Sequence, residues 1–155
     1  MAQIDDIDRK ILALLLEDAQ APYTEVAKKV FVSPGTVHVR MRKLVDLGIV
    51  VGSQLKINYT KLGYDVKAFL GVFLEKGALY DDVVDELNQI PEITNIDYTT
   101  GNYAMFVKIL CRDTKHLREV LHDKVQKVEG IARTETTISL NEDIDRNVAI
   151  EGFFE

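Results

Sequence analysis

The stretch Tyr23–Gly48, YTEVAKKVFVSPGTVHVRMRKLVDLG, predicts two helices joined by a tight turn. Ser33 is a favourable residue to cap the second helix, and Pro34 suits its first position because proline has no N–H to leave unpaired. Gly48 is the expected end of that helix. The second helix is therefore predicted over 34–47, and its buried stripe at helical spacing consists of Val37, Met41, Leu44 and Val45.

The opposite face of this second helix has the chemistry of a major-groove reader. Threonine and valine can contact thymine methyl groups, and arginine and lysine can reach guanine or phosphate. The first helical turn adds a partial positive charge that favours phosphate. Val39 is the strongest indication, since an apolar β-branched side chain on a solvent-facing surface needs a reason. The candidates for base contacts are Thr36, His38, Val39, Arg40, Arg42 and Lys43, and further DNA-binding candidates are Lys28, Lys29, Ser33, Lys56 and Lys61.

The charge distribution supports this interpretation over an ordinary two-helix corner in a small all-α core. The 155 residues carry a net charge of −6. Residues 1–62 hold nine Lys and Arg against seven Asp and Glu, whereas residues 63–155 hold ten against eighteen. Between residues 28 and 61, seven basic residues accompany a single acidic one, Asp46. A basic segment joined to an acidic remainder fits a phosphate-binding module attached to a part that does not contact DNA.

Residues 1–62 are predicted to form a winged helix-turn-helix domain. A first helix over 4–18 has a buried stripe, and the second begins near Thr24. After Gly48 the pattern changes to two short apolar runs, 49–51 and 55–58, around Gly52 and Ser53, which predicts a wing-like hairpin. The stripe of the first helix consists of Ile4, Ile7, Ile11, Leu14 and Leu15.

Residues 63–155 are predicted to form a second, ferredoxin-like domain of the α+β class. Two β-α-β halves in tandem give an antiparallel βαββαβ sheet. The strand over 66–74 is apolar on both faces, so a second subunit or the chain's own loops are needed to cover the face without helices. The expected elements are strands 66–74, 93–100, 103–111 and 131–140 and helices 79–90 and 114–128.

Several classes of protein are disfavoured. Cys111 is the only cysteine, which excludes an internal disulfide framework and fits a reducing cytosol. No apolar run reaches membrane-spanning length, and the first ten residues lack a signal-peptide core, so a cytoplasmic location without membrane contact is expected. Metal-ligand spacings, phosphate loops and nucleophile motifs are not found, so no metal, cofactor or catalytic residue is predicted.

The chain resembles the Lrp/AsnC, or feast/famine, family of bacterial and archaeal transcription regulators. The resemblance covers nearly the whole length, and its motifs are IDRKILALLLEDAQ, EVAKKVFVSPGTVHVRMRKLVDLGIV, KLGYDV, YTTGNYAMFVKILCRD and IARTETTISL. It implies a second domain related to the amino-acid-binding ACT fold, homodimers that assemble further, often to octamers, and a small effector bound between dimers. Asparagine or another small amino acid is the effector that the resemblance suggests.

The same resemblance implies which residues bind the effector. A loop between the second and third strands and the last strand would form the site. Many family members have a Gly-Asp-Tyr-Asp run in this loop, but here the run is Gly101-Asn102-Tyr103-Ala104, which lacks carboxylates for an amino group. The implied effector residues are Thr99, Thr100, Gly101, Asn102, Tyr103, Thr134, Glu135 and Thr136.

The predicted function is a DNA-binding regulator whose dimer presents two copies of the 34–47 helix to double-stranded DNA. Two alternatives are an enzyme similar to the siroheme decarboxylases and an effector-independent nucleoid architectural protein. The enzyme would need basic and histidine side chains in one pocket. His116 and His122 are six residues apart and do not share a helix face, which leaves Arg133 as the one candidate.

Overall fold

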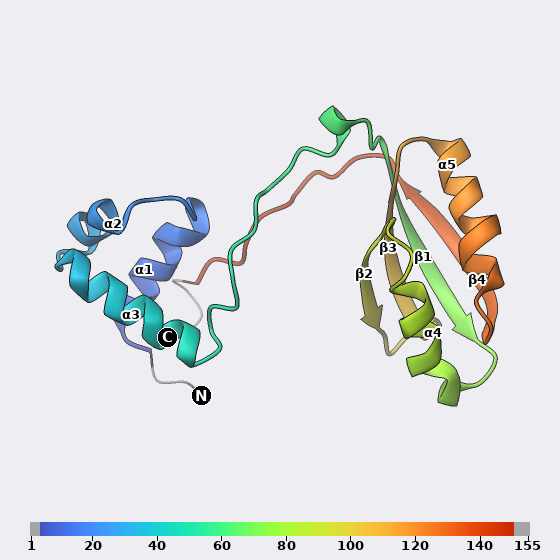
Figure 1. Ribbon diagram of the computed structural model, residues 1–155, viewed down its shortest axis with the longest axis horizontal. Helices are drawn as coiled ribbons and strands as arrows, with labels where there is room; N and C mark the ends of the chain where they lie inside the picture. Colours follow the sequence, from blue (N-terminus) through green and yellow to red (C-terminus); the bar gives the residue numbers. More distant parts are fainter. Residues whose placement is uncertain (1–3, 151–155) are drawn as a thin grey trace. The chain divides into compact units, whose positions relative to one another are not determined.

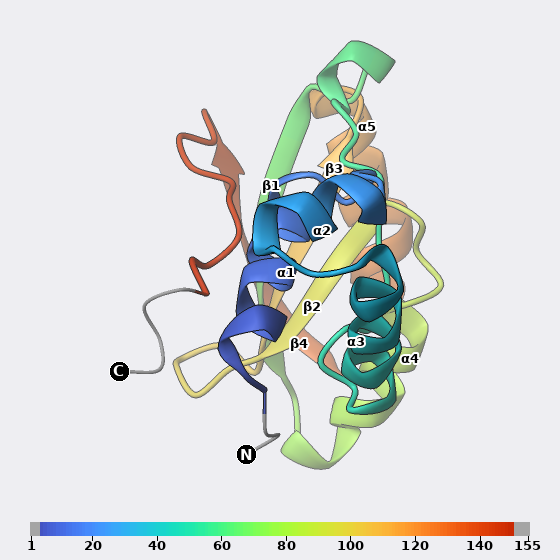
Figure 2. The same cartoon turned by 90° about the vertical axis from the view of Figure 1, so that its left-hand side faces the viewer.

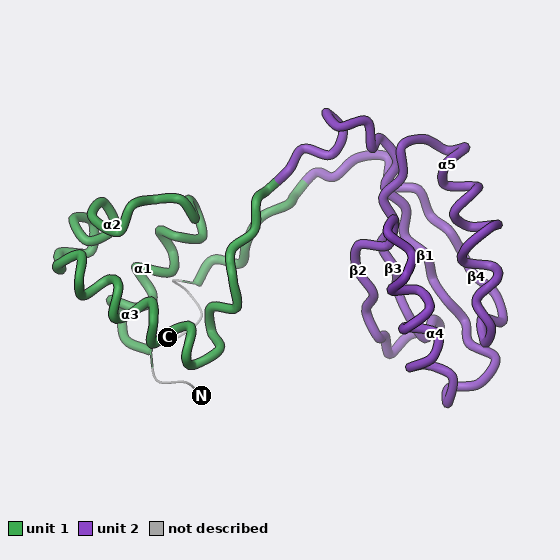
Figure 3. The backbone as a smooth tube through the Cα atoms, viewed as in Figure 1, with its two compact units in different colours: residues 1–56, 144–155 green, residues 57–143 purple. Residues whose placement is uncertain are grey.

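The computed structural model describes residues 4–150, and residues 1–3 and 151–155, the outer ends of the two predicted domains, lie outside the described residues. The chain divides into unit 1, residues 1–56 with 144–155, and unit 2, residues 57–143 (Figure 3). The predicted domain boundary after residue 62 lies six residues beyond this division and stays a prediction.

Unit 1 contains the three predicted helices, α1 (Asp6–Glu17), α2 (Tyr23–Val30) and α3 (Pro34–Asp46), and each contacts the other two (Figures 1 and 2). The N-cap prediction for α3 is confirmed, because the Ser33 Oγ accepts a hydrogen bond of 3.1 Å from the Thr36 N–H. The buried core of this unit consists of Ile11, Val26, Ala27, Val30 and Val37.

The predicted stripe of α3 is correct except at its end. Val37 and Leu44 are fully buried, and Met41 packs against the core, but the side chain of Val45 is 52% exposed. Val45 follows Leu44 by one residue, which rotates its side chain about 100° around the helix. In the described part of unit 1, three short helices enclose this core, so the buried stripe of α3 is too narrow to include Val45. On α1 the periodicity missed Leu12, which is buried.

The wing-like hairpin prediction over 49–58 is wrong, because these residues form no strand. Val51 and Leu55 are 95% and 77% exposed, so the apolar side chains that suggested strands have no core to cover. A two-stranded hairpin without a buried face is marginal in water. The backbone instead runs on from α3 as an irregular segment, and Lys56 pairs with Asp145 at 2.9 Å.

Unit 2 has the predicted antiparallel βαββαβ arrangement (Figure 1). Its strands are β1 (Val66–Leu74), β2 (Ile93–Tyr98), β3 (Met105–Cys111) and β4 (Ile131–Ser139), in the spatial order β2-β3-β1-β4. The helices are α4 (Tyr80–Leu87), preceded by a 3-10 turn, and α5 (Thr114–Glu119), which continues as a π turn over Val120–Lys124 and a 3-10 turn over Val125–Lys127.

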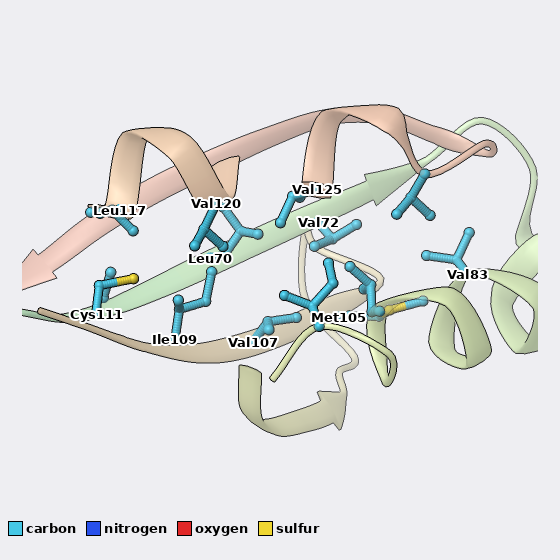
Figure 4. Packing of buried hydrophobic residues seen from close by; sticks show 14 residues of the cluster. Leu70, Val72, Val83, Met105, Val107, Ile109, Cys111, Leu117, Val120 and Val125 are labelled. Atoms are coloured by element: carbon cyan, nitrogen blue, oxygen red, sulfur yellow. The ribbon is translucent and has the colours of Figure 1, made fainter. Parts of the chain in front are cut away.

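The core of unit 2 lies between one face of the sheet and the two helices. Strand residues that alternate along β1 and β3 point toward this layer, where they meet side chains from α4 and from α5 and its continuation (Figure 4). The core residues labelled there are Leu70, Val72, Val83, Met105, Val107, Ile109, Cys111, Leu117, Val120 and Val125. The intervening residues of β1 and β3 therefore lie on the opposite face, which we call the open face.

Candidate DNA-binding face and effector site

The outward face of α3 presents Thr36, Val39 and Arg42 at intervals of three residues, which places them along one side of the helix. Val39 is 68% exposed, and His38 and Arg42 are also exposed. The sequence therefore located the solvent-facing side of this helix. The described residues provide no hydrogen bond or ion pair to Arg42, so its guanidinium is available to a ligand.

Arg40 and Lys43, two of the predicted base readers, are held by carboxylates at the start of α1. Arg40 Nη1 lies 2.6 Å from Asp5 Oδ2 and 2.7 Å from Asp8 Oδ1, and Lys43 Nζ lies 2.9 Å from Asp8 Oδ2. The side chain of Asp8 is fully buried. These ion pairs join α3 to α1, so these two cations have a structural partner inside the protein.

The hydrogen bonds in this cluster shift the pKa values of its members so that their charged forms are favoured. Hydrogen bonds to Asp5 and Asp8 raise the pKa of Arg40. Burial raises the pKa of Asp8, but hydrogen bonds from Lys43, Arg40 and the Asp5 N–H outweigh it, so the pKa lies below the ordinary aspartate value. The hydrogen bond from Arg40 likewise lowers the pKa of Asp5. Asp5, Asp8 and Arg40 are therefore charged at neutral pH.

The remaining DNA-binding candidates differ in their surroundings. Lys28 forms an exposed ion pair of 2.7 Å with Glu25, one helical turn away. Lys29 is exposed on the same last turn of α2. Ser33 is occupied as the cap of α3, and its Oγ lies 2.9 Å from the Thr36 Oγ1. Exposed ion pairs of the Lys28–Glu25 type are weak, so a phosphate can replace Glu25.

The second candidate site lies where the loop between β2 and β3 meets β4. The Tyr103 hydroxyl donates a hydrogen bond of 2.9 Å to Glu135 Oε2, and Arg133 Nη1 lies 2.5 Å from Glu135 Oε1. The Arg133 guanidinium also lies over the Phe73 ring, 3.6 Å from its centroid. Sequence reasoning singled out Tyr103 and Glu135 but missed Phe73, although the alternation along β1 could have found it.

The hydrogen bonds at this site determine the protonation states of Glu135 and Tyr103. Hydrogen bonds from Tyr103 and Arg133 lower the pKa of Glu135, which keeps its carboxylate ionised. The same carboxylate raises the pKa of Tyr103, so the phenol remains a hydrogen-bond donor. The group thus offers an anionic acceptor beside aromatic rings, an arrangement suited to an ammonium group.

The predicted effector residues divide between the two faces of the sheet. Glu135 pairs with Gly71 of β1 on the open face, whereas Thr134 and Thr136 pair with the core residues Val72 and Leu70. Successive strand residues alternate between faces, so the two threonines point to the helix side. The alternation of side chains along the predicted strand 131–140 could have shown that Glu135 and the two threonines lie on opposite faces.

The loop itself is longer than the two residues that separate the predicted strands 93–100 and 103–111, because β2 ends at Tyr98 and β3 begins at Met105. Thr99 and Ala104 close it through a backbone bond of 3.2 Å, and the Thr99 Oγ1 donates a hydrogen bond of 2.6 Å to the Tyr103 carbonyl oxygen. Thr100, Gly101 and Asn102 are exposed at its tip. The structure therefore brings Thr99, Tyr103 and Glu135 together and leaves the tip residues outside this network.

Aromatic side chains cover much of the open face. Phe69 stacks on Phe106 with centroids 5.4 Å apart, and Tyr103 meets Phe73 edge to face at 5.1 Å. Helices α4 and α5 pack on the other face, so these rings remain partly accessible in the single chain.

Within residues 4–150, no helix is long and apolar enough to cross a membrane.

Comparisons with known proteins agree with both parts of this description. Residues 4–45 match the AsnC-type helix-turn-helix domain, and residues 67–148 match the Lrp/AsnC ligand binding domain. The regulatory protein AsnC of Haemophilus influenzae is 42% identical over 148 residues, which cover 96% of this chain and 99% of that protein. The regulatory protein AsnC of Escherichia coli is 40% identical over 145 residues, or 94% of this chain and 95% of that protein.

Solved structures confirm the fold. The structure of Escherichia coli AsnC matches with a TM-score of 0.90 at 39% identity and covers 95% of this chain and 99% of that one. A transcriptional regulator from Neisseria meningitidis, solved as a complex with L-Met, matches with a TM-score of 0.89 at 21% identity, covering 93% and 94%. The relatives are regulatory proteins rather than enzymes. The chain, with its DNA-binding helix-turn-helix and its ligand-binding domain, belongs to the Lrp/AsnC family of transcriptional regulators.

Proposed function

We propose that this regulator reads specific DNA sequences with the outward face of α3 and responds to a small amino acid bound by unit 2. The observation that carries the first part is the exposed Val39, flanked at three-residue intervals by Thr36 and Arg42. In a dimer, two such helices would enter successive major grooves about one helical turn of DNA apart. A cytoplasmic location fits this role.

The ion pairs refine the proposed contacts. Within residues 4–150, Arg42 has no carboxylate partner and can reach a base or a phosphate, and His38 is exposed beside it. Lys28 and Lys29 suit phosphate contacts, which position the protein without reading sequence. Ser33 already caps α3, so it can add such a contact only by donating its hydroxyl hydrogen to the phosphate in place of Thr36 Oγ1. Arg40 and Lys43 are better explained as anchors of α3, because Asp5 and Asp8 already neutralise them.

Replacing Arg42 with alanine is expected to weaken binding to the preferred duplex about tenfold. A well-placed arginine contact to a base contributes about 1–3 kcal/mol of discrimination. The duplex is first selected from a random library with the wild-type protein, and affinity is then measured by fluorescence anisotropy at fixed salt. Lys10→Ala is the matched control, because it removes one exposed positive charge from α1 and leaves α3 intact.

Three outcomes of this experiment are informative. A selective loss in the Arg42 variant supports the assigned face. An equal loss in both variants would show that only net charge matters. A wild-type protein that binds selected and scrambled duplexes equally would point to the architectural alternative, in which deformable DNA rather than base sequence is recognised.

The effector proposal rests on the open-face network. Glu135 can accept hydrogen bonds from an ammonium group, and the backbone N–H groups near Gly101 can reach a carboxylate because glycine allows close approach. The Neisseria meningitidis regulator was solved with L-Met, which supports an amino acid as the ligand class. The open face, apolar and aromatic, would be covered by a second copy of the chain, and further assembly to an octamer is proposed from the family resemblance.

At least one of the twenty amino acids is expected to raise the thermal midpoint of the wild-type protein. A ligand present at one hundred times its dissociation constant stabilises the folded state by about 2.7 kcal/mol. Each amino acid is tested by differential scanning fluorimetry at one protein concentration, with Glu135→Gln as the comparison. If no amino acid shifts the wild-type midpoint, the effector proposal fails while the DNA-binding proposal stands.

A further inference from the structure

Phe31, in the turn between α2 and α3, has a backbone conformation that disfavours its own side chain. Its φ and ψ are 57° and 45°, in the left-handed region. Among the described residues, 4–150, it is the only residue other than glycine with a positive φ. A bulky residue is a clear outlier there, because its Cβ crowds the backbone, whereas glycine adopts this conformation freely.

Burial does not explain why a phenylalanine occupies this position. The Phe31 side chain is 94% exposed, so it adds almost nothing to the core of unit 1. The core around α2 and α3 is already filled by Val26, Val30 and Val37. Residues held in unfavourable backbone conformations without a packing role cluster at functional sites, where their side chains are used.

The surroundings of Phe31 indicate the kind of partner. Lys28 and Lys29 lie in the turn of α2 that precedes it, and α3 begins three residues later with its N–H groups and partial positive charge. A helix-turn-helix brings this region against the duplex when its second helix enters the major groove. An exposed ring among these positive groups matches the apolar sugars and thymine methyl groups beside DNA phosphates.

We propose that Phe31 is a DNA contact and that its ring packs on sugar or thymine methyl carbon at the edge of the major groove. The contact rests on the proposed function, because it needs α3 to be the helix that enters the groove. It adds an apolar contact outside α3 to the readout face. The left-handed conformation itself is held at the end of α2, where the N–H groups of Phe31 and Val32 both donate to the Ala27 carbonyl oxygen.

The test is a pair of substitutions that separate the ring from the backbone conformation. Phe31→Gly relieves the backbone and removes the ring, so it is expected to raise the thermal midpoint by about 3 °C. The same variant is expected to bind the selected duplex about fivefold more weakly at fixed salt. Phe31→Tyr retains both the ring and its conformation, so it is expected to keep the wild-type midpoint and affinity.

The outcomes distinguish this contact from the proposed function as a whole. If Phe31→Gly keeps full affinity while Arg42→Ala loses it, α3 reads DNA but Phe31 does not, and this contact is refuted. If Phe31→Gly loses affinity because the assembly dissociates, which light scattering would reveal, the ring contacts protein and the contact is also refuted. If the wild-type protein selects no duplex at all, the proposed function fails and the contact fails with it.

Discussion

Replacing Asp8 with alanine is expected to destabilise unit 1 by about 3 kcal/mol, because it removes the buried carboxylate that joins two cations of α3 to α1 and leaves Arg40 with Asp5 alone. The fully buried Asp8 carboxylate receives Arg40 and Lys43 and also accepts the Asp5 N–H in the capping box of α1. One substitution thus removes two ion pairs between α1 and α3 and one of the two capping-box hydrogen bonds, while the Asp5 side chain still caps α1. Urea unfolding followed by far-UV circular dichroism measures the loss.

The matched control for this prediction is Asp6→Ala. Asp6 lies in the same first turn of α1 and pairs with Arg9 at 2.9 Å, but its side chain is 79% exposed. Exposed ion pairs contribute about 0–1 kcal/mol. If the Asp8 variant loses no more stability than the Asp6 variant, the buried cluster does not hold α3 in place, and Arg40 and Lys43 return to the list of DNA contacts.

Acid titration gives an independent check on the same cluster. The pKa values of Asp5 and Asp8 are lowered in the folded protein, so their stabilisation is fully present above the ordinary aspartate value of 3.8. It is lost as the pH falls from that value through the lowered folded pKa values, because the unfolded chain binds these protons more readily. The Asp8 variant should show a smaller loss over this range.

Local signals explain how much of the fold the sequence could predict. The strand expected over 66–74 coincides with β1, because a run of apolar and β-branched residues bounded by polar ones needs no tertiary information. The start of α3 was equally predictable from Ser33 and Pro34. The prediction of two strands over 49–58 was wrong, because the apolar side chains of this segment are exposed and have no partner surface to cover.

The candidate sites were harder to predict because their decisive contacts are not local. Arg40 and Asp5 are 35 residues apart, and nothing in the spacing of either helix indicates that they meet. The left-handed backbone conformation of Phe31 could not be predicted from the sequence, since a glycine indicates such a conformation and a phenylalanine does not. The face of the sheet to which Thr134 and Thr136 point is, in contrast, predictable. Side chains alternate along a strand, so both threonines lie opposite to the open face once Glu135 is placed on it.

The second large effect is expected at Gly71, in the middle of β1. A Cβ atom at this position would lie 2.5 Å from the Cδ1 and Cε1 atoms of Tyr103, far inside van der Waals contact. Gly71→Ala is therefore expected to push the Tyr103 ring away from Phe73 and Glu135 and to lower stability by about 2 kcal/mol, as overpacking does. Thermal and urea unfolding at one protein concentration measure this loss.

A double-mutant cycle assigns that loss to the ring rather than to the strand. Alanine favours a strand more than glycine does, so Gly71→Ala should cost little once Tyr103→Ala has vacated the space. Gly77→Ala is the control for glycine replacement alone, because a Cβ there meets no atom within 4 Å. An equal cost of Gly71→Ala in both backgrounds would exclude the Tyr103 contact. If the cost depends on Tyr103, the missing side chain at Gly71 is what lets the ring reach Glu135, and the single variant should also lose its amino-acid response.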